Sequence, residues 1–450
     1  MKEKNRQKKT LAVFALILII AIVLTGLLVY RFAKNKFDEE SRRLRGLQAE
    51  ELASLEKTYT SKTFDLDLLL ALDRLYASNS LTDADKDALT DVLLNAYASG
   101  TGDPYALYMS ADDYTAYLER QSSRFVGIGV SVAPEMAQTD AGQGLTVLTV
   151  YKNSPAAEGG LLAGDVLLSA NSMSFDGKTQ EQAAALVRGE EGSEVTLTYL
   201  RGGQSYSATV TRRTVTEDTV RFDMLHGKIA YVVINRFSAA TAKQLADAVT
   251  ALTDDGARAF IFDVRNNPGG LVTSVSECLG FLLPDGDIIH VDYQKKAANS
   301  YTYRTQDGEL LRVTKNGEDT LTTATDISHT LSLPIAVLTN ESTASAGEIF
   351  AAALRDYREK ELVLARLFGE KTFGKGTVQA TYRIDGGAAF KLSIATYKPP
   401  YGEGYDGIGI TPDRIVPLPE EYRGLSTELV PRESDTQLRA ALDWLATVIQ

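Results

Sequence analysis

The stretch KIAYVVINRFSAATAKQLADAVTALTDDGARAFIFDVRNNPGG, residues 228–270, decides the fold of the larger part of the chain. It opens with a β-type run over 228–237, continues as a helical pattern over 240–252 and returns to a β-type run over 257–265. The same alternation continues toward the C-terminus. Strands that alternate with helices in this way predict an α/β domain, which we place at residues 220–420.

Two strands of this domain end in unusual loops, residues 263–270 (DVRNNPGG) and 340–348 (NESTASAGE). If the strands are parallel, both loops emerge at the same edge of the sheet, where ligands gather in α/β domains. The adjacent glycines Gly269 and Gly270 let backbone N–H groups face a developing anion. The two loops together therefore predict a reactive site.

A third segment, GEKTFGKGTVQ over 369–379, nearly matches the phosphate-binding pattern GxxxxGK[ST]. A β-type run follows where that pattern needs a helix, so we reject phosphate binding. What remains is Lys375, which is either a surface turn lysine or a buried amine. Burial lowers the pKa of a lysine, and a neutral amine could activate Ser345 without histidine. Ser345 and Glu348 also fit the S-x-x-E capping box, so a plain helix cap is the alternative.

Composition narrows the function classes. The 450 residues correspond to about three domains, and 47 basic against 59 acidic residues give a formal charge of −12, which argues against nucleic-acid binding. The single cysteine, Cys278, excludes a disulfide framework and reads as a core residue. The three histidines cannot form HExxH, so a zinc peptidase of that type is excluded. We expect no metal and no cofactor.

The N-terminus carries a membrane signal. Residues 11–30 contain no charge, and a helix of that length spans the hydrocarbon core of a bilayer, about 30 Å. The preceding residues 1–10 are basic, so we expect them in the cytoplasm and the rest of the chain outside it. A cleaved signal peptide is the alternative; its apolar core is usually shorter, about 7–15 residues. We therefore expect a single-pass protein of the cell membrane.

Three further regions complete the domain organisation. Residues 34–100 read as a helical region that could serve as a dimer contact, so a homodimer stays open. Residues 124–213 alternate short β-type runs with Gly-rich turns, and residues 430–450 form a final amphipathic helix. The polar stretch 295–330 reads as an insertion, either a strand pair or a mobile lid.

From about residue 103 to 412 the chain closely resembles the C-terminal (tail-specific) processing peptidases. The resemblance rests on the joint order of several motifs: DPYALYMSADDYTAYLE, FVGIGVSV, SPAAEGGLLAGDVLLSAN, LVRGEEGSEVTL, FDVRNNPGG, NESTASAGEIFAAAL, FGEKTFGKGTVQ and GIGITPD. It implies an α/β catalytic core with a mixed sheet, like that of crotonases and tail-specific proteases, preceded by a PDZ domain. It also implies a serine-type endopeptidase.

The resemblance also implies roles for individual residues. Ser345 falls on the nucleophile, Lys375 on the general base and Gln379 on the residue that orients the lysine. The oxyanion hole is implied at the backbone of Gly269 or Gly270, together with Ala346. Thr343 replaces the first serine of the nucleophile motif, and Gly347 stands where the family often has serine. The segment before Lys375 is a few residues longer than usual, which bears on the spacing of the serine and the lysine.

Residues 124–213 resemble a PDZ domain with Gly127, Ile128, Gly129 and Val130 as the carboxylate-binding loop. Exposed N–H groups there can hold the C-terminus of a substrate, which then adds as a strand. Arg188 is a candidate relay toward the catalytic domain, and a solvated turn arginine is its alternative.

The sequence thus predicts a membrane-anchored serine endopeptidase that recognises substrate C-termini. The rival hypothesis is a catalytically silent PDZ scaffold on a peptidase fold. A binder of lipid- or CoA-type ligands on a related core is disfavoured by the PDZ segment.

Overall fold

The computed structural model describes residues 66–449 apart from 322, 324, 325, 328, 424 and 426. The predicted membrane span at 11–30 lies outside the described residues. No helix among those that are described is both long enough and apolar enough to cross a membrane. The chain divides into two compact units, residues 1–86 and 87–450. The first contains α2 (Leu66–Asn79), in which Leu68, Leu70, Leu72 and Leu75 are exposed. The homodimer stays a prediction.

The α/β domain is built on a six-stranded sheet in the order β10-β11-β12-β17-β18-β21. All neighbours in this sheet are parallel except β10 and β11, so the predicted mixed sheet is confirmed. Its strands are β10 (Val220–Leu225), β11 (Ile229–Ile234), β12 (Ala259–Asp263), β17 (Ile335–Thr339), β18 (Ala365–Gly369) and β21 (Arg414–Ile415).

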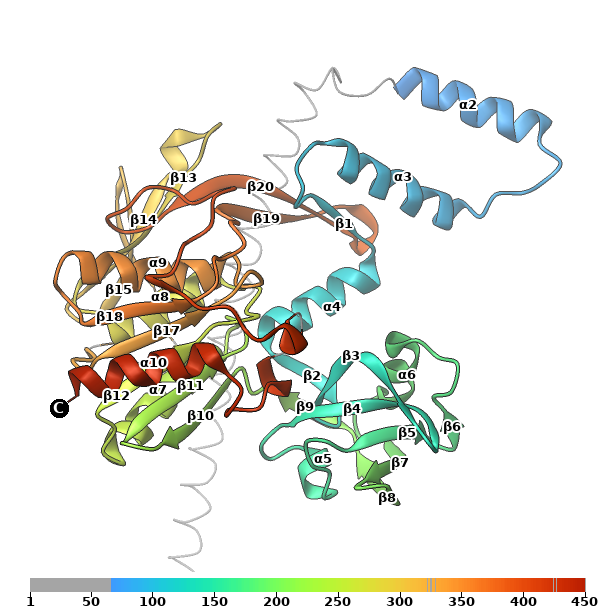
Figure 1. The fold of residues 1–450 in the computed structure, drawn as a ribbon. Coiled ribbons are helices and arrows are strands. Elements are labelled where there is room, and N and C mark those ends of the chain that lie inside the picture. Colours follow the sequence, from blue (N-terminus) through green and yellow to red (C-terminus); the bar gives the residue numbers. More distant parts are fainter. Residues whose placement is uncertain are drawn as a thin grey trace, which may run out of the picture. The chain divides into compact units, whose positions relative to one another are not determined.

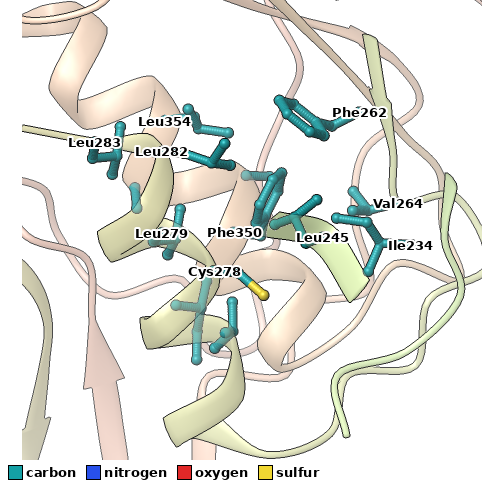
Figure 2. Close-up of a cluster of buried hydrophobic side chains, with 14 of the residues drawn as sticks. Ile234, Leu245, Phe262, Val264, Cys278, Leu279, Leu282, Leu283, Phe350 and Leu354 are labelled. Atoms are coloured by element: carbon teal, nitrogen blue, oxygen red, sulfur yellow. The ribbon is translucent and has the colours of Figure 1, made fainter. Parts of the chain in front are cut away.

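Helices cover both faces of this sheet (Figure 1). On one face lie α7 (Thr241–Asp254), α8 (Val272–Leu282) and α9 (Ala346–Glu359), and on the other lies α10 (Thr436–Val448). Alternate residues of each strand point to opposite faces, so the sheet supplies apolar side chains to two cores. Figure 2 shows Cys278 among leucines and Phe350 in the first core, and burial raises the pKa of its thiol. The prediction of a core cysteine is confirmed.

A second sheet packs antiparallel strands from distant parts of the chain. Its members are β1 (Leu107–Met109), β13 (Gly286–Asp292), β14 (Tyr301–Gln306), β15 (Glu309–Thr314), β16 (Gly317–Leu321), β19 (Thr377–Arg383) and β20 (Ala389–Lys398). The polar insertion supplies β14 to β16 as a three-stranded meander, which continues from β13. α3 (Lys86–Gly100) packs against β1 and β20 through Ala98 and Phe390. β19 begins two residues after Lys375, where a phosphate-binding loop would need a helix, which agrees with the rejection of phosphate binding.

A small β-domain with its own core occupies residues 111–216. Its main sheet has the order β3-β4-β5-β7-β8, with β6 beside β5, while β2 pairs with β9. Its elements are α4 (Ala111–Ser122), which leads into it, β2 (Arg124–Gly127), β3 (Val130–Thr139), β4 (Gly142–Val150), α5 (Pro155–Glu158), β5 (Val166–Ala170), β6 (Met173–Ser174), α6 (Gln180–Val187), β7 (Glu194–Arg201), β8 (Gln204–Thr211) and β9 (Arg213–Thr216). Short 3-10 turns occur elsewhere at Ala297–Asn299, Asp385–Gly387, Glu420–Tyr422 and Thr427–Leu429.

Candidate active site

Three loops meet at one edge of the six-stranded sheet. β12, β17 and β18 are parallel neighbours, so the loops that follow them leave the sheet on the same side. These loops are residues 264–271, 340–345 and 370–376. They carry the glycine pair, the predicted nucleophile and the predicted base, respectively. The expectation that the first two loops share an edge is confirmed.

Ser345 lies at the turn between β17 and α9. It is 6% exposed, and its backbone has φ 52° and ψ −116°, a combination that L-residues rarely adopt. Such a conformation costs on the order of 1–3 kcal/mol and persists where surrounding contacts hold it. The serine also stands at the positive end of the α9 dipole, where a developing negative charge is favoured.

Glu348, in the first turn of α9, joins the Ser345 turn to the loop of Lys375. Its fully buried carboxylate accepts the Ser345 N–H at 3.0 Å and the Lys375 N–H at 2.8 Å. It also accepts the Gly374 N–H at 2.7 Å and the Thr372 hydroxyl at 2.6 Å. The S-x-x-E pattern therefore does more than cap a helix, because the same carboxylate fixes the backbone on both sides of the site.

Lys375 is partly buried, and its amine rests on an aromatic ring. Its Nζ lies 4.4 Å from the centre of the Tyr105 ring, which comes from the loop before β1. Burial lowers the pKa of Lys375, and the charge of Lys391 lowers it further, while Asp103 and Glu348 act in the opposite direction. The amine is thus easier to deprotonate than that of a surface lysine.

The structure does not join every predicted partner. Among the described residues, no hydrogen bond links the Ser345 hydroxyl to the Lys375 amine. The side chain of Ser345 instead interacts with the buried hydroxyl of Tyr397 on β20. Gln379 donates its amide to the carbonyl and hydroxyl of Thr377, at 2.9 and 2.8 Å, and lies at a bulge in β19. Its role in orienting the lysine stays a prediction.

The predicted oxyanion donors lie directly beside the serine. A Cβ placed on Gly269 would lie 2.8 Å from the Ser345 Cβ and 2.9 Å from the Ala346 nitrogen, so only glycine fits there. The Gly269 N–H donates to Asn267 Oδ1 at 2.8 Å. The Gly270 N–H has no acceptor within the part of the chain that the structure describes. Ala346 begins α9, so its N–H has no intrahelical acceptor.

The predicted carboxylate-binding loop lines a groove of the small domain. The groove holds about 300 Å³ and is bordered by residues 127–130, by α6 and by Arg188 at the end of that helix. Gly129 has φ +81°, and a Cβ there would lie 2.3 Å from that of Ser154, so this position requires glycine. β3 is the edge strand of its sheet and lines this groove together with α6.

Two charged residues at the domain boundary also line this groove. Glu217 and Arg236 form an ion pair at 3.6 Å, and Arg236 also donates to the Arg120 carbonyl at 2.8 Å. Burial raises the pKa of Glu217. The next residue, Phe237, exchanges backbone hydrogen bonds with Gly269 and Leu271 at 2.9 and 2.7 Å. The groove and the glycine loop therefore adjoin the same short segment.

Sequence reasoning missed a buried ion cluster behind the glycine loop. Arg265 bonds to both Asp263 and Asp435, and all three side chains are buried. It also missed Asp103 and Tyr105, although both belong to the DPYALYM motif that carried part of the resemblance. In the described part of the chain, no group of three or more His, Cys, Asp or Glu residues is placed to hold a metal.

Comparison with known proteins matches two segments of the chain to known families. Residues 228–416 match the model of peptidase family S41, and residues 146–201 match that of the PDZ domain. A Staphylococcus saprophyticus protein named "Probable CtpA-like serine protease" is 28% identical over 425 residues, which cover 94% of this chain and 77% of the relative. A protein of the same name from Staphylococcus aureus MSSA476 is 30% identical over 342 residues, covering 76% and 62% of the two chains.

The fold likeness extends to solved structures. A Bacteroides fragilis protein described as an S41 protease aligns with a TM-score of 0.52 at 19% identity, covering 82% of this chain and 93% of that one. At this identity the likeness concerns the fold alone. The two family matches and the relatives named as serine proteases identify the chain as a serine-type peptidase of family S41, the C-terminal processing peptidases, with a PDZ domain.

Proposed function

We propose that this peptidase is an endopeptidase that cleaves exported proteins or peptides, with Ser345 as nucleophile and Lys375 as general base. The observation that carries the proposal is the Glu348 carboxylate, which accepts N–H bonds from both residues. The strained turn at Ser345 and the lowered pKa of Lys375 support the same assignment.

The chemistry follows from the groups around the serine. Neutral Lys375 takes the proton of the Ser345 hydroxyl, and Oγ attacks the carbonyl carbon of the scissile peptide. The N–H groups of Gly270 and Ala346 receive the oxyanion, since the Gly269 N–H already donates to Asn267. The lysine then gives this proton to the leaving amine and so returns to its neutral form. The neutral amine next activates the water that hydrolyses the acyl ester.

Two side chains must move for this reaction. The Lys375 amine has to leave the Tyr105 ring and reach Ser345. The Gln379 amide has to turn from Thr377 toward the lysine before it can orient the amine. Resting enzymes commonly hold such groups out of line until substrate binds.

Substrate recognition is assigned to the PDZ groove. A substrate C-terminus would place its carboxylate at residues 127–130 and add as a strand beside β3, with α6 closing the other side. Arg188 borders this groove and is the proposed relay toward the catalytic domain.

We assign the chain to the cell membrane, with the catalytic domain outside the cytoplasm. The support is the uncharged run 11–30 behind a basic N-terminus. Protease added to intact cells stripped of their wall should degrade the large domain. Complete protection, in cells shown to be accessible to the protease, would contradict this topology.

The decisive experiment removes each member of the proposed pair. Ser345→Ala and Lys375→Ala should each abolish peptide cleavage, because removing one member of a catalytic unit costs about as much activity as removing both. The melting temperature of each variant should stay close to that of the wild type. Activity of the wild type should rise with pH through the lowered pKa of the lysine, since only the neutral amine accepts the proton. Lys375→Ala with more than about a tenth of wild-type activity would overturn the base assignment. Failure of a serine-directed suicide substrate to label Ser345 under any condition would favour the silent scaffold.

A further inference from the structure

The loop that carries Tyr105 is firmly attached beside the active site. The Asp103 carboxylate accepts the N–H and the hydroxyl of Ser393 on β20, at 2.7 and 3.0 Å. The Tyr105 N–H donates back to Asp103 at 2.9 Å, and β1 then pairs with β20 from Leu107 onward. The backbone that carries the Tyr105 ring is therefore fixed by the fold on both sides of the residue.

The ring meets the one side chain that the proposed reaction needs in its neutral form. Tyr105 and Lys375 are both partly buried, and the 4.4 Å between Nζ and the ring centre is a close cation–π contact. The ring quadrupole attracts an ammonium ion and gives a neutral amine no comparable attraction. The contact thus favours the protonated lysine, in a position where it makes no bond to Ser345.

Charged groups from three other elements face the same amine. Asp103 in the loop and Glu348 on α9 favour the ammonium form, whereas Lys391 on β20 disfavours it. Asp406 faces the Tyr105 ring, and burial together with the acidic neighbours raises the pKa of the Tyr105 phenol, so the ring stays neutral. The balance at Lys375 is therefore set by contributions of opposite sign.

We propose that Tyr105 is a positioning residue that holds the Lys375 ammonium away from Ser345. This proposal rests on the proposed role of Lys375 as general base. The amine leaves the ring when it loses its proton and then becomes available to the serine. Tyr105 and Asp103 stabilise the resting arrangement, and Lys391 favours the active one. The pH at which the enzyme becomes active is thus determined partly by residues that touch neither substrate nor nucleophile.

The test measures kcat/KM of the full chain against pH with an internally quenched peptide. Tyr105→Leu keeps an apolar cover without the ring, so the midpoint of the profile should move toward acid by about half to one pH unit. Below the midpoint this raises kcat/KM by about three- to tenfold. Tyr105→Phe keeps the ring and should leave the midpoint where it is in the wild type.

A second variant must act in the opposite direction. Lys391→Gln removes a positive charge that disfavours the Lys375 ammonium, so the midpoint should move toward alkali. General loosening of the site would not move two variants in opposite directions. Phe222→Leu is the matched control. Phe222 lies in β10, and its ring centre is 5.1 Å from Lys152 Nζ, so the variant also removes a ring from a lysine, but it should not move the midpoint.

An unchanged or alkaline-shifted midpoint in Tyr105→Leu would overturn the proposal. A fall in kcat/KM without a shift would also overturn it, because it assigns Tyr105 to substrate binding. If Tyr105→Leu does not fold, Tyr105→Met replaces it, since methionine also fills the space without an aromatic ring. An active Lys375→Ala would reject the base assignment itself. An inactive Lys375→Ala beside a wild-type profile for Tyr105→Leu would reject only the role of Tyr105.

Discussion

Glu348 receives hydrogen bonds from the Ser345 turn on one side and from the loop of Lys375 on the other. Because the carboxylate is fully buried and its acceptors are all used, it holds the two backbones at a fixed separation. A carboxamide offers one oxygen where the carboxylate offers two, and its NH₂ would face N–H donors. At the scale of single residues, Glu348 is therefore the position at which the smallest chemical change should disturb the site most.

We predict that Glu348→Gln lowers kcat by about a hundredfold with a smaller effect on KM, since a displacement of about 1 Å at reacting groups has a cost of that order. Steady-state kinetics on a peptide substrate measure both constants. Glu341→Gln is the matched control: it is the same substitution, in the same loop, at an exposed side chain. Equal kinetics for the two variants would remove Glu348 from the machinery.

The sequence could predict part of this arrangement and not the rest. Ser345 and Glu348 are three residues apart, so a local capping rule finds them as a pair. The bond from Glu348 to Lys375 spans 27 residues and depends on the parallel register of β17 and β18, which no local rule supplies. Gln379 was placed near the lysine through the resemblance, yet the bulge in β19 leaves its amide on Thr377.

At the scale of elements, α10 was predicted as an amphipathic helix, and the structure shows what attaches it. Its apolar face covers the sheet opposite α9, and Asp435 begins it by accepting the N–H groups of Gln437 and Leu438. The same carboxylate pairs with Arg265, which lies two residues beyond the end of β12. Arg265 and Asp435 are 170 residues apart, so their pairing could not be read from the sequence.

We predict that Asp435→Ala lowers the free energy of unfolding by about 3–5 kcal/mol, because it leaves the Arg265 charge buried with only part of its partners. Asp435→Asn can still cap the helix, so its loss in the free energy of unfolding should be smaller than that of Asp435→Ala by the contribution of the cap, about 1 kcal/mol. Chemical denaturation measures both values.

The control for the charge is Asp223→Asn. Asp223 pairs with Arg432 at the surface, both side chains being more than half exposed, so the loss should be below about 1 kcal/mol. A similarly small loss for Asp435→Ala would show that the buried cluster contributes little to holding α10.

At the scale of the whole catalytic unit, the PDZ groove and the glycine loop, residues 264–271, adjoin the same short segment, which contains Arg236 and Phe237. Arg236 lines the groove and pairs with Glu217, while its neighbour Phe237 holds Gly269 by a backbone hydrogen bond. A ligand in the groove can shift the catalytic equilibrium only if it binds the active arrangement more tightly than the resting one. A peptide carboxylate that competes for Arg236 would supply such a difference, because it changes the contacts of the residue next to Phe237.

We predict that a peptide with a free apolar C-terminus is cleaved with a kcat/KM about tenfold or more above that of its amidated form, since amidation removes a charged hydrogen-bond acceptor. Arg236→Gln should bring the two values closer together, because the link from the groove to Phe237 is weakened. Arg213→Gln breaks an exposed ion pair with Glu158 outside the groove and should preserve the full ratio. Rates measured on matched peptides with the same cleavage site decide the matter. If the wild type cleaves both peptides equally, the groove does not sense substrate C-termini; if Arg236→Gln preserves the wild-type ratio, the coupling runs through other residues than this segment.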